Sequence, residues 1–265
     1  MQPTCDWHIH THHSCDCPRP EGATLADICA AIEASGITRY GFTDHLHTAV
    51  NVPEIAASRA EFDALPPSPA RRFGVEVSIL RDYDLAANAA AAQPSPYGYQ
   101  PGGPAGTLTL YLPDALRERL HFNYVIAGAH WPLGVPEPLD PHAVIRDYHR
   151  QYLFAATHPH VDIVAHPWWW MGAWQGEDGI YRTNPWFDDF GRIPASMHDE
   201  FAAAVVQYGK AVEINASALL MNDTYPPAFR PRYVEYLAAL KSRGVRFSLG
   251  TDSHAWIGTP YYPCL

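Results

Sequence analysis

Short apolar runs alternate with helix-like segments along most of the chain, and no other feature restricts its fold as strongly. Seven runs are expected to form strands: residues 5–11, 39–44, 72–78, 124–130, 161–166, 211–215 and 246–251. Several are apolar throughout, which is typical of strands covered on both faces. Helical patterns lie between them, beginning with a capping box at Thr24 and Asp27 and continuing at 53–64, 141–157, 196–209 and 231–244. This alternation favours an α/β barrel over an open doubly wound sheet.

Two stretches interrupt the alternation. Residues 82–120 include a Pro- and Gly-rich run at 93–104 that is too rich in turn formers for a regular element, and residues 167–194 hold Trp168, Trp169, Trp170, Trp174 and Trp186. Both stretches follow strands, so in a barrel they would lie over its mouth. We expect the tryptophans to pack in the core rather than to form a wall of the pocket. The chain is therefore expected to be a single domain, 1–265, with insertions at about 82–120 and 167–194.

The composition argues against several classes of function. A formal net charge of −10 disfavours binding to a nucleic-acid backbone, which needs clustered Lys and Arg. Neither a GxGxxG motif nor a P-loop follows any expected strand. No apolar run approaches the ~20 residues needed to cross a bilayer, and no signal-peptide pattern opens the chain. The five scattered cysteines fit a reducing compartment. We therefore expect a cytoplasmic protein with no membrane or nucleic-acid partner, and the sequence does not predict its oligomeric state.

Side chains of metal-binding types stand at the end of nearly every expected strand. They are His8, His10, Asp16, His45, Glu76, His130, His166, Asp252 and His254. Each alone has an ordinary explanation: Glu76 could form a surface ion pair, and His166 could be a satisfied buried histidine. Their recurrence at the same end of successive strands is the stronger observation, because a barrel gathers those ends into one ring.

Imidazoles and carboxylates crowded in one pocket need cations to balance them. One divalent ion takes ~4–6 ligands, so nine candidates suggest two or three metals. Mixed imidazole and carboxylate donors without thiolates suit zinc, manganese or iron rather than calcium. The acidic residues Asp6 and Asp44 lie beside candidate ligands, and we expect them to accept hydrogen bonds from imidazole N–H groups.

The segments that carry these residues resemble the motifs of the PHP (polymerase and histidinol phosphatase) metal-dependent hydrolases. They are His8-Ile9-His10-Thr11-His12-His13-Ser14-Cys15-Asp16, Thr43-Asp44-His45, Gly74-Val75-Glu76, Gly128-Ala129-His130, Asp162-Ile163-Val164-Ala165-His166-Pro167 and Gly250-Thr251-Asp252-Ser253-His254. The resemblance spans nearly the whole chain, and all nine ligand positions of the family are filled.

The resemblance implies a distorted (βα)7 TIM-like barrel and three divalent metal ions. By analogy, one ion would be held by His8, His10, Glu76 and Asp252, a second by Glu76, His130 and His166, and a third by Asp16, His45 and His254. His12 and His13 are additional imidazoles in the first loop, which either contact substrate or face solvent.

The activity implied is hydrolysis of a small organic phosphate ester, with a small phosphorylated molecule as partner and histidinol phosphate as one substrate found in the family. A water bridging two cations loses its proton near neutral pH and supplies a hydroxide nucleophile. Asp252 is the expected catalytic residue, orienting that nucleophile or relaying its proton. Arg19, Arg81 and Arg182 follow strands and are candidate phosphate contacts, although solvated surface arginines are an equal alternative.

Two other functions stay open on the sequence alone. The same metal site could hydrolyse an amide, ester or lactone, which the scarcity of basic residues near the expected mouth makes harder to dismiss. A metal-stabilised module without catalytic activity is the other alternative, and it is disfavoured because the ligand set is intact.

Overall fold

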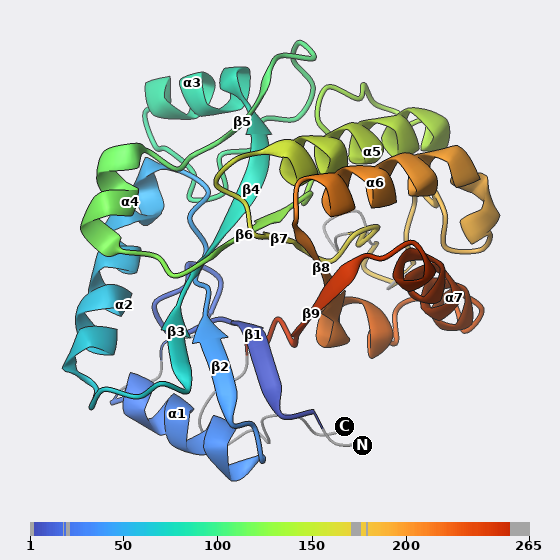
Figure 1. Cartoon of the computed structure of the whole chain (residues 1–265). Helices are drawn as coiled ribbons and strands as arrows, with labels where there is room; N and C mark the ends of the chain where they lie inside the picture. The colour runs from blue at the N-terminus through green and yellow to red at the C-terminus, as the bar shows by residue number, and fades with distance from the viewer. Residues whose placement is uncertain (1–2, 18, 20–21, 171–175, 179, 255–265) are drawn as a thin grey trace.

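A computed structural model describes residues 3–17, 19, 22–170, 176–178 and 180–254 (Figure 1). Its strands form two sheets. In the smaller sheet, β1 (Cys5–Ile9), β2 (Arg39–Phe42) and β3 (Arg71–Phe73) are parallel and adjacent in that order. The larger sheet has the order β5-β4-β6-β7-β8-β9, and only β5 runs antiparallel to its neighbour. Its strands are β4 (Val75–Arg81), β5 (Leu108–Leu110), β6 (Val125–Gly128), β7 (Ile163–Val164), β8 (Ala211–Asn215) and β9 (Arg246–Gly250).

The two sheets do not close into one continuous barrel within the described residues, so the expected (βα)7 barrel is not confirmed. The expected α/β class with parallel strands is confirmed. The sheets meet through isolated bridges between Ile9 and Ser253 and between His45 and Glu76. The two sheets part at Gly74, where the strand expected at 72–78 is divided into β3 and β4. The ring of Tyr124 lies there, 2.7 Å from the position that a Cβ on Gly74 would take.

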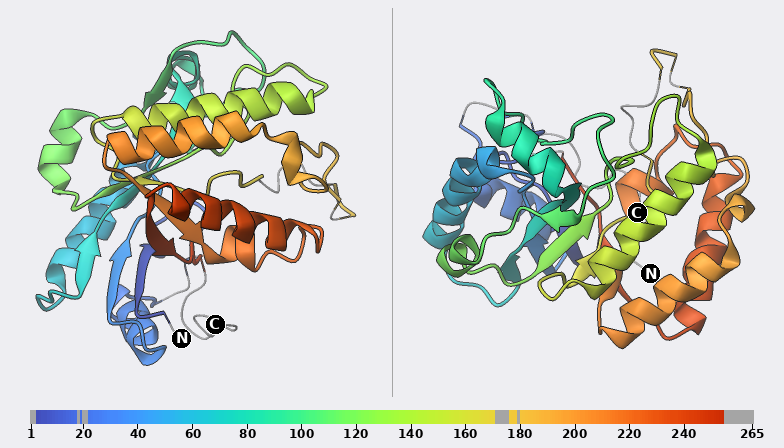
Figure 2. Two further views of the ribbon diagram at one scale, coloured as in Figure 1. Left: turned by 45° about the vertical axis from the view of Figure 1, so that its right-hand side comes forward. Right: turned by 90° about the horizontal axis from the view of Figure 1, so that it is seen from above.

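Seven α-helices flank the sheets among the described residues (Figure 2). They are α1 (Leu25–Ala34), α2 (Val52–Ala64), α3 (Asp82–Ala90), α4 (Asp114–Leu120), α5 (Pro141–Thr157), α6 (Ala195–Gln207) and α7 (Phe229–Ser242). The capping box of Thr24 and Asp27 at the start of α1 is present as expected. Helices α5 and α6 pack side by side, and α5 also contacts β6 and β7. Shorter helical turns occur at Ala49–Asn51, Phe190–Arg192 and Ala216–Leu220.

The segment 82–120 holds more regular structure than its composition suggests. It contains α3, β5 and α4, and only its middle part is irregular. Arg81, which is fully buried, fixes that middle part: its guanidinium pairs with Asp84 at 2.7 Å and donates to the backbone carbonyls of Gly102, Pro104 and Gln100. Arg81 therefore stabilises the loop and is not available as a phosphate contact.

The tryptophan-rich segment packs mainly in the core, as expected. Trp168, Trp170 and Trp186 are 0–2% exposed, and their rings meet Tyr148 and Tyr152 of α5 at centroid distances of 5.1–5.6 Å. Trp169 is only partly buried, and Trp174 lies outside the described residues. Among the described residues, no helix has both the length and the apolar character to cross a membrane.

Candidate metal centre

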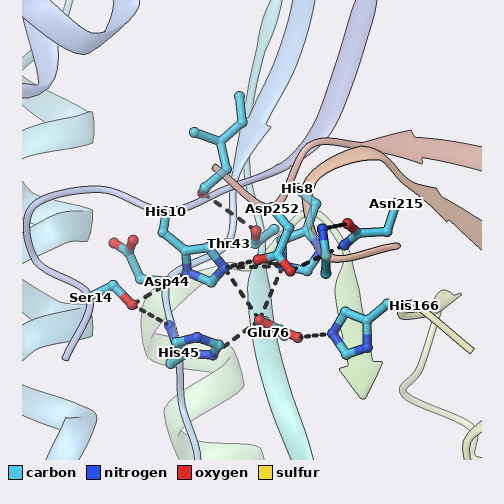
Figure 3. Close-up of polar contacts among 12 residues, drawn as sticks. His8, His10, Ser14, Thr43, Asp44, His45, Glu76, His166, Asn215 and Asp252 are labelled. Carbon is cyan, nitrogen blue, oxygen red and sulfur yellow. Dashed lines mark hydrogen bonds and ion pairs between the residues drawn. The ribbon is translucent and has the colours of Figure 1, made fainter. Parts of the chain in front are cut away.

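Glu76, the second residue of β4, lies at the centre of the gathered ligand candidates and is fully buried (Figure 3). Its two carboxylate oxygens face different imidazoles. Oε1 lies 3.2 Å from Nε2 of His130 and 3.1 Å from Nε2 of His166. Oε2 lies 3.1 Å from Nε2 of His8 and 3.0 Å from Nδ1 of His45. One carboxylate therefore connects groups that come from four different parts of the chain.

The first group of donor atoms comes from β1, the segment after it, β4 and the segment after β9. His8, His10, Glu76 and Asp252 each offer one atom, and these atoms all lie within 4.8 Å of one another. The Nε2 atoms of His8 and His10 are 3.1 Å apart, and Oδ1 of Asp252 is 3.1 Å from Nε2 of His10. This spacing is what donors about 2.0–2.2 Å from a shared ion would show.

Two further groups share members with the first. Glu76, His130 and His166 form one of them. The other contains Asp16, His45 and His254, as expected, and in addition His10. All nine candidate ligands thus converge on one region, in three groups that overlap at Glu76 and His10.

Buried charges in this region depend strongly on one another. Burial disfavours ionisation, but the facing imidazoles outweigh it and hold the pKa values of Glu76, Asp252 and Asp16 well below their ordinary range. Burial likewise opposes protonation of His8, yet the surrounding carboxylates raise its pKa. Burial prevails at His130, whose pKa is lowered. The carboxylates are therefore ionised at neutral pH and create a field that favours cations.

A second layer of polar side chains orients the imidazoles, and its members are not the expected Asp6 and Asp44. Glu213 of β8, 1% exposed, places Oε1 2.6 Å from Nδ1 of His8, and its Oε2 accepts from the backbone N–H of His166 at 2.7 Å. The Oγ of Ser78 lies 2.5 Å from Nδ1 of His130 and 2.6 Å from Nδ1 of His47. An isolated acid within the apolar run of β8 was the available signal for Glu213.

The expected role of Asp6 and Asp44 differs from what the structure shows. Asp6 accepts from the backbone N–H groups of His8 and Thr251 at 3.1 and 3.0 Å. Asp44 accepts from the N–H and hydroxyl of Thr11 at 2.6 and 2.7 Å, and from Ser58. In these contacts both acids hold backbone N–H and hydroxyl groups near the strand ends.

The backbone is in the left-handed region at two candidate ligands. Asp252 has a φ of 58° and His166 a φ of 23°, and neither is glycine. Such conformations cost about 1–3 kcal/mol each and persist where the surroundings fix them. At Asp252 the fixing contact is a hydrogen bond from its N–H to the carbonyl of His8 at 2.7 Å. The strain keeps both side chains directed at the centre.

A cavity of about 620 Å³ opens beside the centre. Seven candidate ligands border it: Asp16, His45, Glu76, His130, His166, Asp252 and His254. Another part of the wall is aromatic and comes from both segments that interrupt the alternation and from the segment after β6. Tyr97 and Tyr99 lie on it together with Trp131 and Trp169, and the rings of Tyr99 and Trp131 stack at 5.4 Å.

None of the three candidate arginines lines this cavity. Arg19 pairs with Glu54 at the surface, and Arg81 is used in the loop described above. No Lys or Arg occurs among the described lining residues, and every Lys and Arg of the sequence lies within the described part of the chain. The cavity therefore offers imidazoles, carboxylates and aromatic rings but no cationic side chain of fixed charge.

Comparisons with known proteins support the fold. No protein-family model matches the chain. No curated protein sequence matches it either. Among solved structures, histidinol phosphate phosphatase from Lactococcus lactis subsp. lactis Il1403, complexed with zinc, L-histidinol and phosphate, aligns with a TM-score of 0.55 and 19% identity over 95% of this chain and 86% of that chain. A Listeria monocytogenes protein, provisionally named a histidinol phosphatase, aligns with a TM-score of 0.60 and 12% identity over 97% of this chain and 98% of that one. At this identity, the likeness establishes a shared fold.

Proposed function

We propose that this chain is a metal-dependent phosphoesterase of the PHP type, built as a single distorted barrel domain, that hydrolyses a small phosphate ester. The observation that carries the proposal is the sharing of Glu76 between overlapping groups of metal-binding side chains at the edge of a cavity. The fold likeness to a phosphatase complexed with zinc and phosphate supports it.

Three divalent ions are proposed for the centre, held by the groups His8-His10-Glu76-Asp252, Glu76-His130-His166 and Asp16-His45-His254 with His10 beside the last. The donor set fits zinc, manganese or iron. Cys15 lies in the same loop as Asp16, but burial raises the pKa of its thiol to about 11, and it is in none of the three groups of donor atoms. When bound, such ions activate water and neutralise the charge that develops on a phosphoryl group.

Asp252 is the proposed catalytic residue. It borders the cavity, and its two oxygens have different surroundings. Oδ1 faces the imidazole of His10, whereas Oδ2 accepts from the side-chain amide of Asn215 at 3.2 Å. This arrangement holds the carboxylate in one orientation, from which it can position an attacking water and accept its proton.

The leaving group is proposed to be small and partly apolar. Three divalent ions would outweigh the carboxylates Asp16, Glu76 and Asp252 in charge, so a phosphate could be held without a guanidinium group. The remaining wall, formed by rings such as those of Tyr97 and Trp131, suits an uncharged or aromatic group. Histidinol phosphate is the first natural compound to test, given the complex of the structurally similar phosphatase.

The test is phosphate release from 4-nitrophenyl phosphate and histidinol phosphate with zinc or manganese added. We expect turnover that a chelator abolishes and that Glu76→Gln reduces by at least 100-fold, because Glu76 serves overlapping ligand groups. Glu235→Gln on the exposed face of α7 is the matched control and should retain full activity. A rate of phosphate release in Glu76→Gln equal to that of wild type would refute the proposal.

Hydrolysis of an ester or lactone at the same centre is the alternative, and the lack of Lys and Arg around the cavity favours it. The two activities can be distinguished with substrates that share one leaving group, by comparing hydrolysis of 4-nitrophenyl acetate with hydrolysis of 4-nitrophenyl phosphate. Activity on the acetate alone, lost in Asp252→Ala, would replace the phosphoesterase assignment. Loss of either activity in Asp252→Ala would also exclude a non-catalytic module.

A further inference from the structure

A second cluster of metal-binding side chains lies away from the cavity. His12 and His13, in the loop after β1, both direct Nε2 at one oxygen of Glu61 in α2. The distances to Oε2 are 3.1 Å from His12 and 2.7 Å from His13. The three donor atoms lie within 4.8 Å of one another. These two histidines thus face a carboxylate, and none of the three residues lines the cavity.

The spacing in this cluster resembles that of the main centre. There, the nitrogen–oxygen distances are 3.1 Å between His8 and Glu76 and 3.2 Å between His130 and Glu76. Donors about 2.0–2.2 Å from a tetrahedral ion lie roughly 3.3 Å apart. Both distances to Glu61 are shorter than this, so each imidazole needs only a small outward movement to reach this geometry.

Contacts that need no ion already hold the donors in place. The other oxygen of Glu61, Oε1, accepts from the N–H of Leu25 at the start of α1, at 2.6 Å. The N–H of His13 donates to the hydroxyl of Thr11 at 3.1 Å, and that hydroxyl donates to Asp44 at 2.7 Å. Orientation of ligands by such outer contacts is a regular feature of metal sites.

We propose that His12, His13 and Glu61 bind one divalent transition-metal ion, of the zinc type, in a site separate from the main centre. Two imidazoles and one carboxylate are a donor set that zinc accepts, with water as the fourth ligand. The side chains are 12%, 21% and 28% exposed, so solvent reaches the remaining coordination position. The inference does not depend on the catalytic proposal.

An ion at this site joins the loop after β1 to α2, and through Leu25 to α1. The same loop continues to Asp16, whose carboxylate lies 2.9 Å from Nε2 of His45 in the main centre. Fixing the loop at His12 and His13 therefore also restricts Asp16. We expect occupancy of the outer site to strengthen binding of the ion next to Asp16.

The experiment counts zinc per chain by elemental analysis after dialysis at fixed free zinc concentrations. Wild type is expected to bind one more equivalent than Glu61→Gln, in which the amide oxygen can still accept from Leu25. Glu54→Gln is the matched control: it lies on the same helix, and its side chain is also 28% exposed. Cobalt substitution gives a second readout, since the four-coordinate visible absorption of wild type should exceed that of Glu61→Gln by the contribution of one site.

Equal zinc counts in wild type and Glu61→Gln would overturn the proposal, leaving the cluster as a hydrogen-bonded one. A loss of the same size in Glu54→Gln would do so as well, because it would indicate unspecific surface binding. His12→Asn repeats the test if Glu61→Gln does not fold. Glu76→Gln separates the two sites, since it should lower the count at the main centre and leave the outer equivalent in place.

Discussion

At the scale of single residues, the centre depends on a few buried acids that serve several imidazoles at once. Glu76 pairs with five of them through its two oxygens, and Glu213 contacts the other ring nitrogen of His8. Glu213 also receives the backbone N–H of His166, so it aligns two candidate ligands that lie far apart in sequence. Glu213, unlike Glu76, belongs to none of the three ligand groups, so it can orient ligands without touching an ion.

Glu213→Gln is expected to weaken metal binding by about 10- to 100-fold, the usual effect of losing such an orienting partner. The reason is that the amide keeps the shape but not the negative charge beside Nδ1 of His8. The measurement is a zinc affinity titration together with kcat and KM. As a positioning residue, Glu213 should change metal affinity while KM at saturating metal stays near its original value. An unchanged zinc affinity would contradict this role.

A titration at His198 predicts how stability varies with pH. Its ring stacks on Phe190 at a centroid distance of 5.7 Å, and burial, with Arg243 and His149 nearby, lowers its pKa from 6.5 to about 4. The fold thus favours neutral His198, whose stabilising contribution is complete above pH 6.5 and is lost as the pH falls toward 4.

The free energy of unfolding of wild type should therefore fall between pH 7 and pH 4. In His198→Phe, which has no imidazole to protonate, we expect this fall to be smaller by on the order of 2 kcal/mol. Urea unfolding at both pH values measures it, with a chelator present so that protonation of the metal ligands affects both proteins alike. Parallel pH dependence in the two proteins would show that His198 is not responsible.

At the scale of secondary-structure elements, the bounds of a strand could be predicted best where the strand is apolar and uninterrupted. β8 has the expected bounds, and β9 differs by one residue. The strand expected at 72–78 is two strands that part at Gly74, where Tyr124, a residue distant in sequence, packs against the backbone. Helices α3 and α4 and strand β5 were missed, since the Pro- and Gly-rich run between α3 and β5 dominated the pattern.

The same distinction applies to the centre. Its nine candidate ligands could be found because they recur at strand ends, which is a local pattern. Ser78, His47 and Glu213 could not be assigned in this way, because their partners lie 31–205 positions away. His12 and His13 could not be assigned either, since they lie in a loop and their partner Glu61 comes from α2.

The segment between α3 and β5 allows a test of substrate contact. Tyr97 lies on the cavity wall and is 41% exposed, so truncating it should cost little stability. Tyr97→Ala is expected to raise KM for an aryl phosphate about 10-fold, by removing aromatic contact, while kcat and the zinc count stay unchanged. Tyr208→Ala, with a side chain 50% exposed after α6, is the control. A KM in Tyr97→Ala equal to that of wild type would show that the leaving group does not contact the ring of Tyr97.

At the scale of the whole molecule, the centre lies where the two sheets meet. His8 and His10 come from the smaller sheet and its following loop, whereas Glu76 and Asp252 come from the larger sheet and the residue segment after β9. The direct backbone links there are few: isolated bridges at Ile9–Ser253 and His45–Glu76, with neighbouring hydrogen bonds. Bound ions would therefore connect the sheets as well as serve the reaction.

Removing the ions is expected to lower the melting temperature and to loosen the junction of the sheets. A ligand present at 100 times its Kd stabilises the folded state by about 2.7 kcal/mol, so several ions give a large effect. Calorimetry with and without chelator measures it, and amide hydrogen exchange should show the largest increase at β1 and after β9. Unchanged melting in the chelated protein would mean that backbone contacts alone hold the sheets together.

The pairing of His10 with Asp252 spans 242 positions of the chain. On a ribosome, β1 therefore emerges long before the residues after β9, and its ligands wait for partners that are made much later. A nascent chain in which Asp252 and His254 have not yet emerged can present only part of the metal centre. A chain truncated before β9 would likewise lack these two ligands and could not complete the centre.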